Sequence, residues 1–512
     1  MKNTSRKRFQ RQAVVLLILD GWGIAKGKKG NAIANAKTPN LDFLSKRYPH
    51  AILRAAGEAV GLPPGNQGTS EVGHLNIGAG RIVDQSLVRI NKSLKDKSFF
   101  RIKGLVSAID HCKKYRRTLH LMGLLQDQGV HASQEHLFAL MRLCKMRRFK
   151  DVAIHVFSDG RDTLPKSCMR YISALKRQIR KLGLGNIATL SGRYYSMDRD
   201  KRWHRTRKAY ECIANGKGLR AKSIDSAVSQ AYGRDETDEF ILPTAIGSYE
   251  GLKNNDAVIF YNFRYDRARQ ITMAMVEPGF AGFKRKMKEI FFVGMTDYYK
   301  GMRARIAFQP LKLKNTLGEV ISRHGMKQLR VAETEKYAHV TYFFNGLQEK
   351  PNRGEDRILI PSLKVATYDL APRMRAYEIA KKVIEKLDTT KYGLIVANFA
   401  NGDMVGHTGV FKAGIQACEH VDKCIGSVYR AAQSAGAALI ITADHGNCEK
   451  MKEKNGSPNT AHTTSQVPFI LAASGNYQLR NGILSDIAPT ILRLLSIKKP
   501  KEMDRKGLIV NI

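Results

Sequence analysis

Acidic and imidazole side chains occur together where apolar segments end. In "NGDMVGH", Asp403 and His407 are four residues apart, which places both side chains on one face of a helical turn. In "AALIITADHG", Asp444 and His445 follow an apolar, β-branched segment directly. Adjacent strand residues point to opposite faces, so these two converge only if the chain leaves the strand, and Gly446 permits such a turn. The pattern predicts a site for divalent metal ions.

Two more residues complete this candidate set. Asp20 ends the first apolar segment, "AVVLLILD", and His462 lies in the polar stretch "NTAHTTSQVP" before the next apolar segment. Carboxylate and imidazole ligands without thiolates suit manganese, magnesium or zinc rather than copper or an iron–sulfur cluster. Each histidine alone is more often an ordinary surface or core residue, so the prediction depends on their joint occurrence. A pair of ions would suit phosphoryl transfer.

A candidate nucleophile lies in "NQGTSEVGHLNIGAG". Ser70 is surrounded by glycines, and Glu71 and His74 follow it closely. A serine hydroxyl is a poor nucleophile unless a base or a metal ion activates it, and one of the predicted ions would do so. The alternative is an ordinary glycine-rich loop with no chemical role.

A separate group of cationic residues lies in the middle of the chain, on predicted loops. Its members are His131, Arg161, Arg193, Arg199, Arg264 and Arg267. Several guanidinium groups in one small site indicate a substrate that carries phosphate and carboxylate, which arginine binds in bidentate fashion. Asp162, next to Arg161, is a candidate general base for a substrate hydroxyl. The alternative is that these arginines are only part of the overall basic surplus.

Strand-like and helix-like segments alternate along the whole chain, which predicts an α/β fold with largely parallel sheets. Five apolar segments end in polar residues, namely Asp20, Arg161 with Asp162, Arg264 with Arg267, Asp403, and Asp444 with His445. Ligand sites in open α/β sheets lie outside the carboxyl ends of the strands. We therefore expect these polar residues to line one or two active-site clefts.

Composition excludes several classes of protein. The chain has 512 residues, 43% hydrophobic, which indicates a globular protein of two or more domains. Its seven cysteines form no C-x-x-C pair, and we predict neither a disulfide framework nor a cysteine zinc site. The first residues form a basic arm rather than a secretory signal, and no apolar run reaches a membrane span of about 18 residues. We expect a cytoplasmic protein that does not contact membranes.

The net charge of +41 raises nucleic-acid binding as an alternative function. The basic residues are spread along the whole chain, however, and no nucleic-acid-binding motif accompanies them. Such a protein would also leave the Asp and His set unexplained. We therefore predict no specific nucleic-acid partner and attribute the charge to a general bias.

The motifs resemble one family closely, the cofactor-independent (2,3-bisphosphoglycerate-independent) phosphoglycerate mutases of the alkaline phosphatase superfamily. The resemblance covers nearly the whole chain. It rests on "LDGWG", "GNAIANAKTPNLD", "SEVGHLNIGAGR", "LHLMGLL", "DGRDT", "GRYYSMDRD", "NFR", "AETEKYAHVTYFFNGL", "VATYDL", "DMVGHTG", "TADHGN", "AHTT" and "DIAPT". One departure from the family pattern is Thr69, which stands beside the nucleophile where asparagine is usual.

The resemblance implies a discontinuous phosphatase-like domain, residues 1–85 and 311–512, and an inserted α/β transferase domain, residues 86–310. It implies that Asp403, His407 and His462 bind one ion. The implied ligands of the other ion are Asp20, Ser70, Asp444 and His445. The implied substrate contacts are His131, Arg161, Asp162, Arg193, Arg199, Arg264, Arg267 and Lys336.

The implied reaction interconverts 3-phosphoglycerate and 2-phosphoglycerate through a phosphoserine at Ser70, with no bisphosphoglycerate. Asp162 would serve the glycerate hydroxyls as base and acid, and Lys336 would offset charge on the phosphoryl oxygens. Two divalent ions are implied, with Mn²⁺ as first choice and Mg²⁺ or another ion as alternatives, and we expect a monomer. The competing function is a metal-dependent phosphatase of the same superfamily, which would need the ions and Ser70 but not the arginine-rich segment.

Overall fold

The first apolar segment forms a buried strand. The computed structural model describes residues 13–389 and 391–511, and in it β1 (Val14–Leu19) is buried along its whole length. A strand covered on both faces has a continuous apolar sequence because both sides of the pleat contact the core. The predicted basic arm, residues 1–12, lies outside the described residues.

β1 belongs to a largely parallel sheet. Among the described residues this sheet has eight strands in the order β12-β11-β13-β1-β14-β15-β2-β17. Only β15 runs antiparallel to its neighbours. The other strands are β2 (His50–Arg54), β11 (Lys327–Glu333), β12 (Glu355–Ile360), β13 (Tyr392–Phe399), β14 (Ala438–Thr442), β15 (Val467–Ala472) and β17 (Gly482–Ile483).

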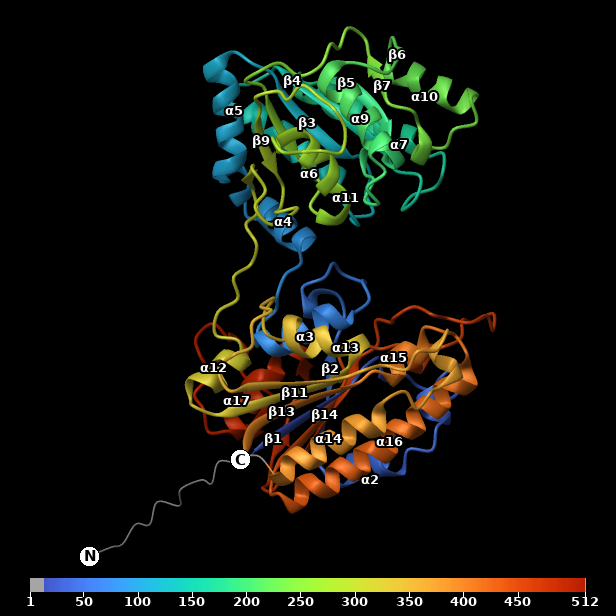
Figure 1. Ribbon diagram of the computed structural model, residues 1–512, viewed down its shortest axis with the longest axis vertical. Helices are drawn as coiled ribbons and strands as arrows, with labels where there is room; N and C mark the ends of the chain where they lie inside the picture. The colour runs from blue at the N-terminus through green and yellow to red at the C-terminus, as the bar shows by residue number, and fades with distance from the viewer. Residues whose placement is uncertain (1–12, 390, 512) are drawn as a thin grey trace, which may run out of the picture. The chain divides into compact units, whose positions relative to one another are not determined.

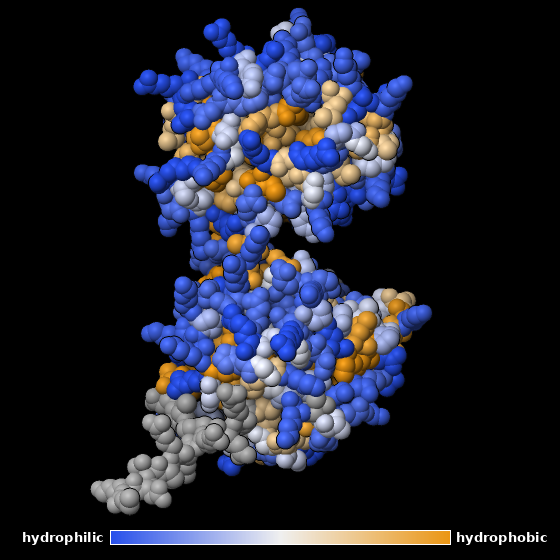
Figure 2. Space-filling view, turned by 60° about the vertical axis from the view of Figure 1, so that its left-hand side comes forward, coloured by the Kyte–Doolittle hydropathy of each residue, from blue (hydrophilic) through white to orange (hydrophobic). Residues whose placement is uncertain are grey.

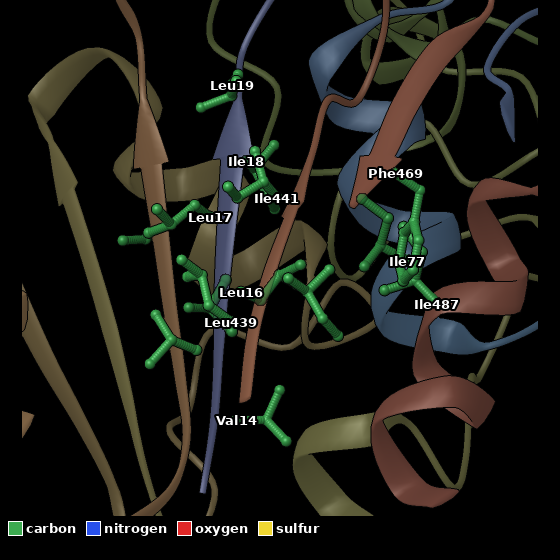
Figure 3. Close-up of a cluster of buried hydrophobic side chains, with 14 of the residues drawn as sticks. Val14, Leu16, Leu17, Ile18, Leu19, Ile77, Leu439, Ile441, Phe469 and Ile487 are labelled. Atoms are coloured by element: carbon green, nitrogen blue, oxygen red, sulfur yellow. The ribbon is translucent and has the colours of Figure 1, made fainter. Parts of the chain in front are cut away.

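Helices cover both faces of this sheet (Figure 1), with α2, α14 and α16 on one face and α3, α12 and α17 on the other. In Figure 3, Ile77 of α3 and Ile487 of α17 pack against Phe469 of β15. The helices are α1 (Ala32–Asn35), α2 (Pro39–Arg47), α3 (Ser70–Ala79), α12 (Leu317–Arg323), α13 (Thr334–Ala338), α14 (Ala376–Thr389), α15 (Asn401–Gly406), α16 (Phe411–Ser434) and α17 (Ile487–Leu494). A two-stranded ribbon, β16 (Gln478–Leu479) with β18 (Ile509–Asn511), lies outside the sheet.

A second sheet lies in the middle of the chain. Its described strands follow the order β10-β9-β8-β3-β4-β5-β7-β6, and only β5 and β7 pair antiparallel. The strands are β3 (Leu119–Leu124), β4 (Val152–Ser158), β5 (Asn186–Gly192), β6 (Leu219–Ala221), β7 (Thr244–Ile246), β8 (Ala257–Phe260), β9 (Phe291–Gly294) and β10 (Arg305–Ile306). The helices are α4 (Ser86–Lys95), α5 (Lys103–Tyr115), α6 (Gln134–Met146), α7 (Cys168–Leu182), α8 (Arg193–Ser196), α9 (Trp203–Asn215), α10 (Ile224–Gly233) and α11 (Tyr265–Val276). Two largely parallel sheets confirm the predicted α/β class.

The contacts divide the chain into two compact units. Unit 1 comprises the residues up to Gln85 and from Lys312 on, and unit 2 comprises Ser86–Leu311. Each has its own apolar core. The expected crossings were after residues 85 and 310.

Polar residues dominate the visible face of each unit, with smaller apolar patches between them (Figure 2). All seven cysteines are buried free thiols. No helix in residues 13–389 and 391–511 has both the length and the apolar character of a membrane span.

A chain of buried polar side chains crosses the sheet of unit 2. His120 Nε2 lies 3.2 Å from Asp256 Oδ2, and His120 Nδ1 lies 2.9 Å from His155 Nε2. His155 Nδ1 lies 2.9 Å from the Thr189 hydroxyl. Burial, and then the neighbouring His120, hold the pKa of His155 well below its usual value, so the ring is neutral in the folded protein.

This lowered pKa predicts acid sensitivity of unit 2. Below a pH of about 6.5, His155 is protonated in the unfolded chain but stays neutral in the folded protein. The free energy of unfolding therefore decreases as the pH falls, by up to about 1.4 kcal/mol per pH unit. We expect His155→Gln to reduce this slope. The measurement is urea unfolding at pH 7.5 and 5.0 in a Trp22→Phe background, where Trp203 fluorescence reports on unit 2. Exposed His204→Gln is the control, and an unchanged slope in His155→Gln would contradict the prediction.

Candidate active site

The predicted metal ligands meet at one edge of the unit 1 sheet. β1, β13 and β14 are parallel, so the residues after their carboxyl ends, Asp20, Asp403 and Asp444, lie at the same edge. β15 is antiparallel to β14, which brings His462, before the amino end of β15, to this edge as well. Lys336 reaches it from α13, directly after β11. The topology therefore brings the three aspartates predicted from strand ends together with His462 and with Lys336, which only the resemblance implies.

Ser70 and Lys336 contact each other within this cluster. Ser70 is the first residue of α3, so the serine opens a helix and does not lie in an irregular glycine-rich loop. Its hydroxyl oxygen lies 2.7 Å from Lys336 Nζ, 2.9 Å from His445 Nε2 and 3.1 Å from Asp20 Oδ1. Lys336 Nζ also lies 2.7 Å from Asp20 Oδ1 and 2.6 Å from Asp403 Oδ2. An ammonium group thus touches the nucleophile and two carboxylates.

Two histidines are oriented as metal ligands. His407 Nδ1 lies 2.7 Å from the Thr460 carbonyl oxygen, and His462 Nδ1 lies 2.8 Å from the Gly68 carbonyl oxygen. Because a carbonyl oxygen only accepts, these bonds place a proton on Nδ1 and leave Nε2 of each ring available to a metal ion. Both Nε2 atoms lie 3.1 Å from Asp403 Oδ1 and 3.0 Å from each other. Two lone pairs this close repel unless a proton or a metal ion lies near both, so the arrangement fits a cation.

The carboxylates of the candidate metal site favour positively charged groups beside them. Burial alone would raise the pKa of Asp20, but Lys336 and His445 hold that pKa well below its usual value. Burial would likewise lower the pKa of His445, yet Asp444, Asp20 and Asp403 raise it to about 10. Asp444 Oδ2 is buried and makes no hydrogen bond, although His74 Nδ1 lies 3.2 Å away. These observations fit divalent ions, which carboxylates and imidazoles bind.

Two groups of side chains have ligand atoms close enough to share an ion. One is Asp403, His445 and His462, and the other is Asp20, Asp444 and His445. His407 Nε2 adjoins the first group through Asp403 and His462. His445 therefore lies between the two groups.

Sequence reasoning missed the residues that orient the carboxylates. Asn398, inside β13, donates to Asp20 Oδ2 at 2.8 Å and lies 3.1 Å from His74 Nε2. His74 Nδ1 lies 2.9 Å from the Ser70 carbonyl oxygen and 3.2 Å from Asp444 Oδ2. The one available signal was an amide within an otherwise apolar strand, "GLIVANF".

Gly446 was expected to permit a turn of the chain, but the structure gives a different reason for a glycine at this position. Its backbone is not left-handed. A Cβ there would instead overlap the Thr463 hydroxyl and the Glu449 carboxylate, so the position needs a glycine because other groups approach closely. The neighbouring Thr69 is the N-cap of α3, where its Oγ1 accepts from Val72 N at 3.3 Å.

The arginine-rich set lies at one edge of the unit 2 sheet. β3, β4, β5 and β8 are parallel, and the predicted residues follow their carboxyl ends. The predicted loop positions are wrong for two of them. Arg193 begins α8 and Arg267 lies in the first turn of α11, while Arg264 is the N-cap of α11.

Asp159 and Asp266, together with the predicted Asp162, hold these arginines in place, and the sequence pattern indicated neither Asp159 nor Asp266. Arg193, only 2% exposed, contacts Asp159 Oδ1 and Asp162 Oδ2 at 2.6 Å each. Asp266 contacts Arg199 at 2.9 Å and Arg264 at 3.3 Å. Buried guanidinium groups need such partners. In the sequence, Asp159 in "SDGRD" and Asp266 in "RYDR" look like ordinary charged neighbours of the arginines.

The remaining members adjoin this network. His131 lies 3.9 Å from Asp162 Oδ2 and 3.7 Å from Asp266 Oδ1. Burial, and then Arg193, lower the pKa of His131 to about 4, so the ring is neutral. Burial and then three other arginines lower the pKa of Arg267. Arg161 is about half exposed and contacts Glu239 at 3.3 Å. Unit 2 thus concentrates positive charge suited to an anionic ligand.

Comparison with known proteins agrees with these sites. Residues 12–499 match the Metalloenzyme superfamily. The 2,3-bisphosphoglycerate-independent phosphoglycerate mutase of Acetivibrio thermocellus is 51% identical over 97% of this chain and 99% of its own. That of Methanosarcina barkeri is 51% identical over 98% and 99%. The crystal structure of Leishmania mexicana phosphoglycerate mutase at low cobalt concentration aligns with a TM-score of 0.66 and 29% identity over 99% of both chains.

Identity at this level over nearly the full length, together with the metal-ligand cluster and the serine within it, establishes the family and a dependence on divalent metal. The chain belongs to the 2,3-bisphosphoglycerate-independent phosphoglycerate mutases of the Metalloenzyme superfamily.

Proposed function

We propose that this chain interconverts 3-phosphoglycerate and 2-phosphoglycerate through a phosphoserine at Ser70, without bisphosphoglycerate. The observation that carries the proposal is the contact of the Ser70 hydroxyl with Lys336, His445 and Asp20, all within 3.1 Å. A buried serine beside an ammonium group and candidate metal ligands has what phosphoryl transfer requires. The names of the relatives support the substrate.

The two metal groups would hold two divalent ions, with Mn²⁺ as the proposed species. Asp403, His407 and His462 would bind one. Asp20, Asp444 and His445, with Ser70, would bind the other. When bound, the ions would supply positive charge to the phosphoryl oxygens and would lower the pKa of a bound hydroxyl. His445 belongs to both groups of neighbouring ligand atoms, which supports its place close to both proposed ions.

Lys336 would offset negative charge on the nucleophile, and Asp20 would orient its hydroxyl group. The Ser70 hydroxyl donates to Asp20 Oδ1, and the Lys336 ammonium group donates to the Ser70 oxygen. A cation that faces the oxygen favours loss of the hydroxyl proton, and the resulting alkoxide is a stronger nucleophile. The same ammonium group would offset charge on the transferring phosphoryl group.

Unit 2 would hold the glycerate. Its arginines bind the phosphate and the carboxylate, and Asp162 acts at the glycerate hydroxyls. In the first half-reaction the Ser70 hydroxyl loses its proton as its oxygen bonds to phosphorus, the bond from phosphorus to the C3 oxygen breaks, and that oxygen takes a proton from Asp162. In the second, the C2 hydroxyl returns a proton to Asp162, its oxygen bonds to phosphorus, the bond from phosphorus to the Ser70 oxygen breaks, and Ser70 regains its proton. No water is consumed, so retention of the glycerate is what separates isomerisation from hydrolysis.

These roles imply that unit 1 is the phosphatase-like domain and unit 2 the transferase domain. We also propose a cytoplasmic monomer with small-molecule partners. A simple phosphatase, the second candidate, would have no use for the Arg193 and Asp266 networks.

The decisive experiment follows both products at once. Metal-stripped protein is given 3-phosphoglycerate without bisphosphoglycerate, and we expect no turnover until Mn²⁺ is restored. We then expect 2-phosphoglycerate to form with no rise in free phosphate. Phosphate release without isomerisation would make the protein a phosphatase. Turnover at the same rate without metal would contradict the proposed role of the ions.

A further inference from the structure

Glu449 joins three loops that carry the proposed metal ligands. It lies in a single 3₁₀ turn, η6 (Cys448–Lys450), and is 2% exposed. From its position we propose that Glu449 is a positioning residue that holds these loops at the spacing that ion binding requires. This inference rests on the proposed function, because the ligands it positions are those assigned above.

Each loop contributes one hydrogen-bond donor to the same carboxylate. Gly23 N, in the loop after Asp20, donates to Oε2 at 3.1 Å. Asn447 N, in the loop of Asp444 and His445, donates to Oε2 at 2.8 Å. The hydroxyl of Thr463, next to His462, donates to Oε1. A single side chain thus bonds to a neighbour of ligands from both proposed ions.

The surroundings leave space for this carboxylate and nothing larger. A Cβ at Gly23 or at Gly446 would overlap the Glu449 carboxyl group. Among the described residues no Lys, Arg or His forms an ion pair with Glu449, so two backbone N–H groups and one hydroxyl compensate the buried charge. A buried carboxylate that loses such donors is costly, which makes the three bonds interdependent.

Glu449 is not itself a member of either ligand group. Its effect is therefore indirect, as with the outer residues that orient metal ligands in other proteins. Backbone bonds between the same loops remain without it, including Cys448 N to Gly21 O at 3.0 Å and Thr463 N to Gly446 O at 3.0 Å. We therefore expect its removal to leave a folded protein whose ligands are poorly spaced.

The test compares Glu449→Ala with a matched control in the same unit, Glu355→Ala. Glu355 is also buried, at 8% exposure, and accepts from Asn345, Asn352 and Arg357. It begins β12 and so lies at the opposite edge of the sheet. Mn²⁺ affinity of metal-stripped full-length protein is measured by calorimetry without substrate, together with the melting temperature of the metal-free protein.

We expect Glu449→Ala to weaken Mn²⁺ binding by about 10- to 100-fold and Glu355→Ala by less than about 3-fold, although both lower the melting temperature. Glu449→Gln keeps an oxygen for both N–H groups and should restore most of the affinity. If Glu449→Ala does not fold, Thr463→Val removes one donor and should still weaken binding more than Glu355→Ala does.

Equal affinities in Glu449→Ala and wild type would overturn the inference and leave the proposed mutase activity intact. Equal losses in Glu449→Ala and Glu355→Ala would reduce Glu449 to a structural role. Wild-type protein that binds no Mn²⁺ would instead count against the proposed function.

Discussion

Ser70→Ala should abolish isomerisation while leaving substrate binding in place. Loss of a nucleophile that works with its neighbours as a unit typically lowers turnover by about 10⁴-fold or more. The proposed substrate contacts of unit 2 do not include Ser70, so the affinity for 3-phosphoglycerate should change by less than about 3-fold. Turnover is measured with Mn²⁺ at saturating substrate, and affinity by calorimetry. Mass spectrometry of the quenched wild-type reaction should find phosphate on the Ser70 peptide.

Thr69→Ala separates the chemical effect from a structural one. It removes the N-cap of α3 and keeps the nucleophile, which costs about 1 kcal/mol of stability. We expect this variant to keep at least about a tenth of wild-type turnover. A Ser70→Ala protein with more than about 1% of wild-type turnover would show that the phosphoryl group does not pass through this serine.

The strand ends explain why much of the site could be predicted from sequence. Asp20, Asp403 and Asp444 each follow a buried parallel strand, and parallel strands bring their carboxyl ends to one edge. A rule about topology therefore placed side chains that are hundreds of residues apart. The same rule indicated Arg161 and Arg264 in unit 2, although it could not show that Arg264 caps a helix.

The role of Lys336 could not be predicted from the local sequence pattern. The chain has 86 lysines and arginines, and nothing in "AETEKYAH" distinguishes this one. Only the resemblance assigned it a role, and only the structure places its ammonium group among Asp20, Asp403 and Ser70. Asp266 was missed for the same reason, because an aspartate among arginines is unremarkable in sequence and informative only through its contacts.

Glu449 was missed because its partners come from three loops. A glutamate after "TADHGN" carries no local signal of burial, and its donors are 426, 2 and 14 residues away in the chain. Two of these donors are backbone N–H groups, and residue types do not indicate which backbone N–H groups will bond to a side chain. Ligands can thus be predicted from residue type, whereas the groups that space them depend on the folded loops.

Lys336→Met should lower turnover by about 10²- to 10³-fold, the usual loss when one group that stabilises a developing negative charge is removed. Burial lowers the pKa of Lys336, but Asp20, Asp403 and Asp444 raise it above its usual value, so the side chain is a permanent cation. Methionine keeps the approximate length and the apolar stem but carries no charge. The measurement is turnover at saturating Mn²⁺, with Lys382→Met, a partly exposed partner of Glu385, as the control.

The affinity for Mn²⁺ distinguishes this role from that of a metal-site scaffold. The ammonium group lies 2.6–2.7 Å from two candidate ligand carboxylates and so would compete with a divalent ion for them. Removal of that charge should leave Mn²⁺ affinity equal or higher, while turnover falls. A Lys336→Met protein that loses affinity and turnover in parallel would show that Lys336 acts by holding the ligands in place. Opposite directions for the two quantities would show that its charge acts on the phosphoryl group.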